Sequence, residues 1–384
     1  MKFPHPKLQI FCFAVLLACL SLTANAQDSM ERGQTFDFAK SALKSADVAK
    51  VPLEDLTLMR GIVFGRHGRV FKDAMIKTYL EAQDWYKPNT DFQNSMLNAT
   101  ERNNLDLIRV AEASKHETVQ PGDMRYWRTR ALTPRKLGKH SGAEWLVLRS
   151  EIEAIHGKRF ESDPWLQQYF DERYWYKAGK YDPTSLSAIE QKNLATITLV
   201  QKRSRKVALA PGDMELFENR LISAQMLHGL SLYELRLLRN EVYARHGRSF
   251  QATWLVQYFF SQPWYQPNDN FKDEQLSGSD KTNVETIVAY EMKIHDDLSR
   301  KPVTRSLLEG LFVEDASQMR QEIYARRGKV FKEPWLQKYF SSFAWYKADP
   351  NFTDARLTDL EKRNIATIAA YEKKAVSAAS VIEG

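Results

Sequence analysis

Apolar residues recur along this chain at helical spacing, and the same pattern returns four times. In each copy a first segment places an apolar stripe on one helical face and ends at a glycine, which can take the left-handed conformation that closes a helix. An aromatic-rich second segment, a Trp-Tyr pair and a third helical segment follow. No alternation typical of strands competes with this pattern. The stripes that we expect to be buried are Leu56, Met59 and Val63; Trp145, Leu148 and Ile152; Leu235, Leu238 and Val242; and Ala316, Met319 and Ile323.

The third segment of each copy begins with a capping box or a close variant of it. In this arrangement the first side chain accepts a backbone N–H, and an acidic residue three positions later accepts the N–H of the cap residue. The first segment shows the same signal at Ser141 and Ser231. The four pairs that begin the third segment are Asn98 and Glu101, Ser187 and Glu190, Ser277 and Asp280, and Thr358 and Glu361.

Repetition on this scale predicts an array of small modules. We expect an all-α fold, an elongated tandem array of four small three-helix modules joined by short amphipathic connectors. The connectors are too apolar for loose linkers, and two of them share a Pro-Gly-Asp-Met sequence that begins at Pro121 and Pro211. The predicted segments are a signal peptide at 1–26, connectors at 27–51, 113–140, 202–230 and 292–312, modules at 52–112, 141–201, 231–291 and 313–373, and a tail at 374–384.

The N-terminus has the features of a secretion signal. Lys2 and Lys7 precede an apolar run, and small residues end at Ala26, where cleavage is expected. The run is too short for a membrane helix, and no second long apolar stretch follows, so we expect no transmembrane segment in the mature chain. Residues 16–19 also resemble a lipobox, so lipid attachment at Cys19 stays an alternative to simple cleavage. The predicted location is periplasmic or extracellular.

Composition narrows the classes of function. Both cysteines, Cys12 and Cys19, lie in the predicted signal, which leaves the mature chain without a disulfide or a thiol nucleophile. Removing Lys2 and Lys7 with the signal lowers the net charge from +7 to +5. This mild excess does not suggest nucleic acid, but it is compatible with an anionic polymer or surface of the cell envelope.

The glycine-terminated openings resemble the YARHG domain, a bacterial family named for that string. The third copy reads Tyr243-Ala244-Arg245-His246-Gly247, and the fourth reads Tyr324-Ala325-Arg326-Arg327-Gly328. The first copy reads Phe64-Gly65-Arg66-His67-Gly68, and the second reads Glu153-Ala154-Ile155-His156-Gly157. The resemblance extends to an asparagine in the third segment of each copy. It implies an exported protein, and the family carries no established molecular function.

The histidine of the string is expected to be structural. In the last turn of a helix a positive charge complements the helix dipole, and Arg327 serves this purpose as well as the histidines of the other copies do. Arginine neither binds metals nor acts as a useful base. With no triad, metal or phosphate-loop motif elsewhere, we expect no catalytic residue, no metal and no cofactor.

Two kinds of arginine and one tryptophan are candidates for binding. The first arginine is the same in every copy, and it either bridges to the third helix, at its asparagine or near the Trp-Tyr turn, or binds a carboxylate or phosphate. The tryptophan is either part of a core that replaces missing disulfides or an exposed platform for a sugar. The candidates are Arg60, Arg149, Arg239 and Arg320; Arg66, Arg245 and Arg326 of the string; and Trp85, Trp175, Trp264 and Trp345.

These features favour an exported, non-catalytic, multivalent protein that binds a cell-envelope component, either cell-wall glycan or an envelope protein. Several weak sites on one chain can raise avidity by about 10²–10⁴. A structural spacer of the envelope is the alternative. An accessory of a hydrolase or peptidase is a third hypothesis, and it requires one module with an acidic or histidine cluster that the others lack.

Overall fold

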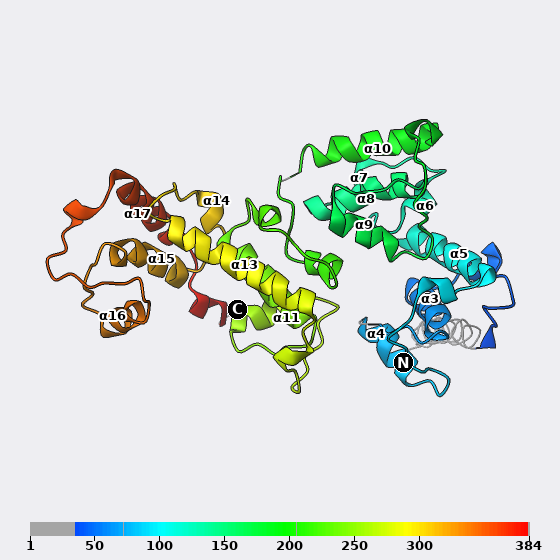
Figure 1. The fold of residues 1–384 in the computed structure, drawn as a ribbon, viewed down its shortest axis with the longest axis horizontal. Coiled ribbons are helices and arrows are strands. Elements are labelled where there is room, and N and C mark those ends of the chain that lie inside the picture. Colours follow the sequence, from blue (N-terminus) through cyan, green and yellow to red (C-terminus); the bar gives the residue numbers. More distant parts are fainter. Residues whose placement is uncertain (1–34, 72, 205, 383–384) are drawn as a thin grey trace, which may run out of the picture. The chain divides into compact units, whose positions relative to one another are not determined.

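The computed structural model describes residues 35–71, 73–204 and 206–382, so the predicted signal and Cys19 lie outside the described residues. All regular secondary structure in the described part is helical, which confirms the all-α prediction (Figure 1). The chain forms two compact units, the first from residues 1–140 and 144–204 and the second from residues 141–143 and 205–384. Modules 1 and 2 therefore belong mainly to the first unit, and modules 3 and 4 belong to the second.

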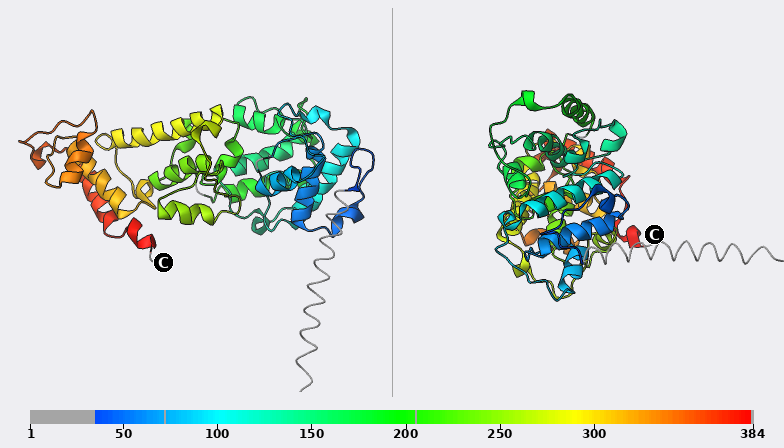
Figure 2. Two further views of the ribbon diagram at one scale, coloured as in Figure 1. Left: turned by 90° about the horizontal axis from the view of Figure 1, so that it is seen from below. Right: turned by 90° about the vertical axis from the view of Figure 1, so that its right-hand side faces the viewer.

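Each module contains the three helices that the pattern predicts. In modules 1, 3 and 4 the first helix packs mainly on the third, and in module 1 the second helix also packs closely on the first. Among the described residues the longest helix is α13, which has 20 residues and is drawn in yellow (Figure 2). The first helices are α3 (Leu53–Gly65), α8 (Gly142–Ala154), α11 (Leu232–Ala244) and α15 (Val313–Ala325); the second are α4 (Ala74–Glu81), α9 (Pro164–Asp171), α12 (Thr253–Phe260) and α16 (Pro334–Ser341); the third are α5 (Ala99–Lys115), α10 (Ala188–Gln201), α13 (Gly278–Asp297) and α17 (Asp359–Glu372).

Short helical turns fill the remaining segments. One 3₁₀ turn precedes every third helix, and others lie in the connectors and the tail. They are α2 (Ser45–Ala49), η1 (Asn94–Met96), α6 (Met124–Trp127), α7 (Pro134–Leu137), η2 (Pro183–Ser185), η3 (Asp213–Phe217), η4 (Ala224–Leu227), η5 (Asp273–Gln275), α14 (Arg305–Leu308), η6 (Asp354–Arg356) and η7 (Ala378–Ile382).

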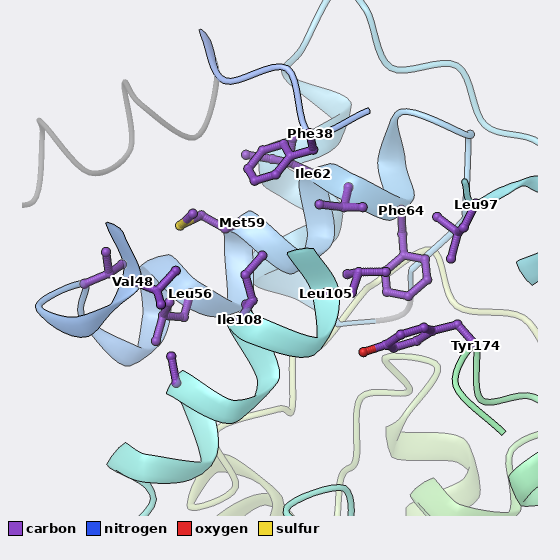
Figure 3. Close-up of a cluster of buried hydrophobic side chains, with 13 residues drawn as sticks. Phe38, Val48, Leu56, Met59, Ile62, Phe64, Leu97, Leu105, Ile108 and Tyr174 are labelled. Atoms are coloured by element: carbon purple, nitrogen blue, oxygen red, sulfur yellow. The ribbon is translucent and has the colours of Figure 1, made fainter. Parts of the chain in front are cut away.

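The predicted apolar stripes form the interior of the modules. Every residue of the four stripes is buried, which confirms the periodicity argument. In module 1 the stripe of α3 faces Leu105 and Ile108 of α5, as Figure 3 shows. Burying a large apolar side chain stabilises the fold by about 1.5–3 kcal/mol, so these pairs of helices supply the core that a chain without disulfides needs.

Capping side chains and glycines fix where the helices begin and end. The capping boxes at Asn98, Ser187, Ser277 and Thr358 are all formed, and so is the one at Ser231. The glycine after the first helix has a positive φ in every module, as at Gly68 (φ 79°), and its carbonyl accepts the N–H of the loop after the Trp-Tyr pair. A Cβ at Gly68 would lie 2.4 Å from the Lys87 carbonyl oxygen, so only glycine fits there.

One buried asparagine joins each connector to the third helix. Asn283 Oδ1 accepts the N–H of Ile222 at 2.9 Å, and its Nδ2 donates to the carbonyls of Phe217 and Arg220. Three backbone groups of the connector thereby find partners inside the protein, where no water is needed to satisfy them. The same three bonds occur at Asn104, Asn193 and Asn364.

The Pro-Gly-Asp turns of the connectors pack on the first helix of the following module. The N–H of Gly122 donates to Glu151 at 2.8 Å, and that of Gly212 donates to Glu241 at 2.6 Å. Module 4 has no such turn. There His295, in the last turn of the long α13, bonds to the corresponding carboxylate at 2.6 Å, which belongs to Glu322.

No helix in the described ranges is both long enough and apolar enough to cross a membrane.

Candidate functional site

The residue before the turn glycine clamps the first helix to the third. Its side chain bonds to the acidic residue of the capping box, and the same carboxylate also accepts the N–H of the cap residue, so one carboxylate joins two helix ends. Arginine and histidine form the same bridge, which explains why they exchange at this position. The four bridges are His67 to Glu101 at 2.7 Å, His156 to Glu190 at 2.9 Å, His246 to Asp280 at 2.9 Å and Arg327 to Glu361 at 2.9 Å.

The electrostatics of this bridge favour the ionised carboxylate. Burial alone would raise the pKa of Glu190, but hydrogen bonds from His156, Ser187 and Arg128 outweigh burial and lower the pKa to about 2. The pKa values of Asp280 and Glu361 are also lowered, again against the effect of burial. These groups are therefore charged at neutral pH and act in the fold as acceptors, with no proton to give.

The arginine of the string that stands two positions before the turn glycine lies over the tryptophan of the Trp-Tyr pair in modules 1, 3 and 4. The guanidinium carbon is 3.8 Å from the ring centre for Arg66 on Trp85, 4.3 Å for Arg245 on Trp264 and 4.6 Å for Arg326 on Trp345. The rings are partly buried against the module cores, and the arginines cover part of their outer faces. The sequence left open whether the tryptophan rings belong to the core or form an exposed platform. In the structure they lie at the edge of the core and are partly exposed.

Module 2 departs from this arrangement because Ile155 stands where the others have arginine. In module 3 the guanidinium of Arg245 bonds to buried Glu241 at 2.9 Å. Glu151, the counterpart of Glu241, lacks that cation, and burial raises its pKa to about 7. Arg125 from the connector approaches the Trp175 ring instead, at 6.0 Å.

The first arginine is bound within its own module in three of the four copies. Its partner is a glutamate near the end of the third helix, and not the asparagine or the carbonyls that the sequence analysis considered. In module 2, Gln201 occupies the place of that glutamate, and Arg149 is partly exposed. The three pairs are Arg60 to Glu112 at 3.0 Å, Arg239 to Glu291 at 3.1 Å and Arg320 to Glu372 at 2.7 Å.

A fourth recurring basic position was missed by the sequence analysis. The residue after the turn glycine is always basic, and it lies over the aromatic residues of the first helix and its loop in modules 1, 3 and 4. Its carbonyl accepts the hydroxyl of the tyrosine in the Trp-Tyr pair. A basic residue in all four copies was the signal that could have found it. The four residues are Arg69, Lys158, Arg248 and Lys329.

The turn glycine of module 4 borders an open basic hollow of about 490 Å³. Arg326, Arg327 and Trp345 form one side of the hollow, and Lys347 and Arg356 add two exposed cations at its rim. Asp349, which pairs with Arg356, is the acidic residue of the lining. Four cations, one carboxylate and a half-exposed indole ring form a surface suited to an anionic ligand with a flat or apolar part.

The repeated helices, the glycine turns and the Arg-Trp contacts define the chain as an all-α tandem-repeat protein. The YARHG domain family matches it four times, at residues 35–113, 123–202, 213–292 and 293–373. The chain therefore belongs to the YARHG domain family. No curated protein and no solved structure matches the chain.

Proposed function

We propose that this protein is an exported, non-catalytic binding protein that attaches to an anionic component of the cell envelope through repeated basic-aromatic faces. The observation that carries this proposal is the hollow of module 4, where Arg326 covers Trp345 and the rim adds Lys347 and Arg356. Modules 1 and 3 repeat the Arg-Trp contact, so several weak sites can act together.

The invariant first arginine contributes less to this proposal than the rim does. The guanidinium groups of Arg60, Arg239 and Arg320 already bond to glutamates, and a ligand would have to displace those partners. At the hollow, Lys347 is exposed, and the pair of Arg356 with Asp349 lies at the surface, where such a pair contributes little to stability, so a ligand displaces it at little cost. We therefore propose that the rim residues bind the ligand and that the first arginine stabilises the fold.

Co-sedimentation of residues 27–384 with purified peptidoglycan sacculi across a salt series tests the proposal. The test variant is Lys347→Gln with Arg356→Gln, and the charge-matched control is Lys338→Gln with Lys373→Gln, two exposed lysines of module 4 outside the hollow. We expect retention that falls with salt, because screening weakens contacts between exposed charges. We also expect a loss in the test variant that exceeds the loss in the control.

The other outcomes separate the alternatives. Equal loss in both variants would reject the hollow as the site. No retention at low salt would reject the wall polymer, and cross-linking to envelope proteins would then test the second class of ligand. A structural spacer predicts no retention on any envelope fraction and tolerance to deletion of one repeated unit of about 90 residues.

A further inference from the structure

Within the first unit, a turn of module 2 closes a groove on module 1. Tyr174 lies just before the Trp-Tyr pair of module 2, yet its ring belongs to the core of module 1, where it meets the Phe64 ring edge to face with centres 6.0 Å apart. Figure 3 shows this ring beside Phe64 and Leu105. The ring is 6 % exposed, so the groove seats it almost completely.

Polar contacts fix the position of this turn. The hydroxyl of Tyr174 donates to Asp106 Oδ1 at 2.6 Å, and the carbonyl of Tyr174 accepts a bond from Arg102. Asn94 Nδ2 donates to the carbonyl of Glu172 at 2.9 Å. The groove thus recognises a tyrosine by its ring, its hydroxyl and its backbone, and the hydroxyl is the feature that distinguishes tyrosine from phenylalanine.

Module 3 has related residues at most of the positions that form this groove, and Asp273 stands in the place of Asn94. Counting from the asparagine of the third helix, Glu285 stands in the place of Asp106 and Lys281 in the place of Arg102. Tyr243 replaces Phe64 as the aromatic wall. The cation after the turn glycine has the same position in both modules, since Arg69 lies 4.6 Å from the Phe64 ring and Arg248 lies 4.6 Å from the Tyr243 ring.

The groove of module 3 is open. It is a hollow of about 570 Å³ whose floor includes Leu255, Val284 and Val288. Val284 is partly exposed, whereas its counterpart in module 1, Leu105, is completely buried. Tyr243 is also partly exposed, whereas Phe64 is 3 % exposed. These apolar surfaces are covered in module 1 by the turn of module 2.

The other two modules lack the acceptor for a tyrosine hydroxyl. Ala195 of module 2 and Ala366 of module 4 stand in the place of Asp106. Module 2 also has Glu153 where the other modules have an aromatic wall, and Glu153 bonds to Lys158. The complete set of ring wall, carboxylate and cation is thus present in modules 1 and 3, and module 1 has its occupant within the chain.

We infer that the groove of module 3 binds a tyrosine-bearing turn of a partner protein. The tyrosine ring packs between Tyr243 and Val284, its hydroxyl donates to Glu285, and its carbonyl accepts from Lys281. An acidic residue two positions before the tyrosine faces Arg248, as Glu172 interacts favourably with Arg69 in module 1. This site is separate from the basic hollow of module 4 and does not depend on it.

A fluorescence titration tests the inference. Both cysteines of the chain lie within residues 1–26, so Ser249→Cys in the protein of residues 27–384 gives one labelling position at the groove. The probe is a cyclic peptide that contains residues 170–177, which include Glu172 and Tyr174. Val330→Cys labels the equivalent position of module 4, where Ala366 removes the acceptor, and serves as the matched control.

We expect saturable binding at module 3 that weakens about tenfold when the peptide carries Tyr174→Phe or the protein carries Glu285→Ala, since a hydrogen bond to a charged group is lost. The label on module 4 should not respond. Equal binding of the tyrosine and phenylalanine peptides would overturn the inference.

A protein with Tyr174→Ala and a label at Val70→Cys tests whether the free peptide can bind a groove of this kind. The change Tyr174→Ala empties the groove of module 1, and circular dichroism verifies that the variant is folded. Binding to the opened module 1 but not to module 3 would overturn the inference. Binding to neither groove would overturn it as well.

Discussion

Replacing the buried asparagine of module 3 tests whether the connector is part of the module. Asn283 is completely buried and makes three hydrogen bonds to the connector backbone. The change Asn283→Ala removes all three, and the Phe217 carbonyl keeps the N–H of Arg220 as a donor. A buried polar group left unsatisfied costs about 1–3 kcal/mol, and partial relaxation toward solvent brings the expected total to about 4 kcal/mol.

Urea denaturation followed by circular dichroism measures this loss. Hydrogen exchange adds a local measurement, because the N–H of Ile222 donates to Asn283 Oδ1 and should exchange faster in the variant. Asn270→Ala is the matched control, since Asn270 is exposed in the same module and should change stability by less than about 0.5 kcal/mol.

A loss below about 1 kcal/mol with unchanged exchange at Ile222 would refute the reasoning, because the connector would then be held by other contacts. The equivalent change at Asn193 repeats the test in the other unit, where the same three bonds are present.

Two further predictions concern the buried charges. Burial raises the pKa of Glu151 to about 7, above its ordinary value of 4.5. The protein should therefore become less stable as the pH rises from about 4.5 to about 7, because the buried carboxyl group is then forced to ionise. Glu151→Gln should remove this pH dependence of the unfolding free energy across that window. The matched change Glu241→Gln should instead destabilise by about 1–3 kcal/mol at neutral pH, because Arg245 loses its nearest carboxylate and keeps the Gly212 carbonyl and the more distant Glu215. Arg327→His should stay within about 1 kcal/mol of the wild type, and Arg327→Ala should cost about 1–2 kcal/mol because Glu361 loses its cation. Urea midpoints measured across pH check all four variants, and a loss for Arg327→His as large as that for Arg327→Ala would contradict the equivalence of histidine and arginine.

Local features of the fold were predictable from sequence, because local physics determines them. The buried stripes follow from apolar spacing, the capping boxes from residues three positions apart, and the turn glycines from their place after the last helical residue. Each depends on a few neighbouring residues. The four copies strengthened these predictions, because a feature that returns in the same column is not a coincidence of composition.

Contacts between distant residues were harder to predict. The partner of Arg60 is Glu112, 52 positions away, and the sequence analysis had considered the asparagine instead. The repeats did contain a signal, because the histidine or arginine before the turn glycine and its carboxylate are 34 positions apart in all four modules. The place of Tyr174 has no such signal. It depends on how module 2 packs on module 1, and one copy of that arrangement leaves no periodic trace.

The pattern of invariant and variable positions separates stability from binding in this chain. All modules share the asparagine, the turn glycine and a histidine or arginine before the glycine, and each bonds within its module or to the connector before it, so their invariance reflects the fold. Some positions that differ pack inside a module, such as Ile155, but others face outward or face a neighbouring module, such as Asp106 and Glu285 against the alanines of modules 2 and 4. Four modules with one fold and different outer surfaces can bind different ligands. We therefore propose that binding specificity resides where the modules differ, at the groove of module 3 and the basic hollow of module 4.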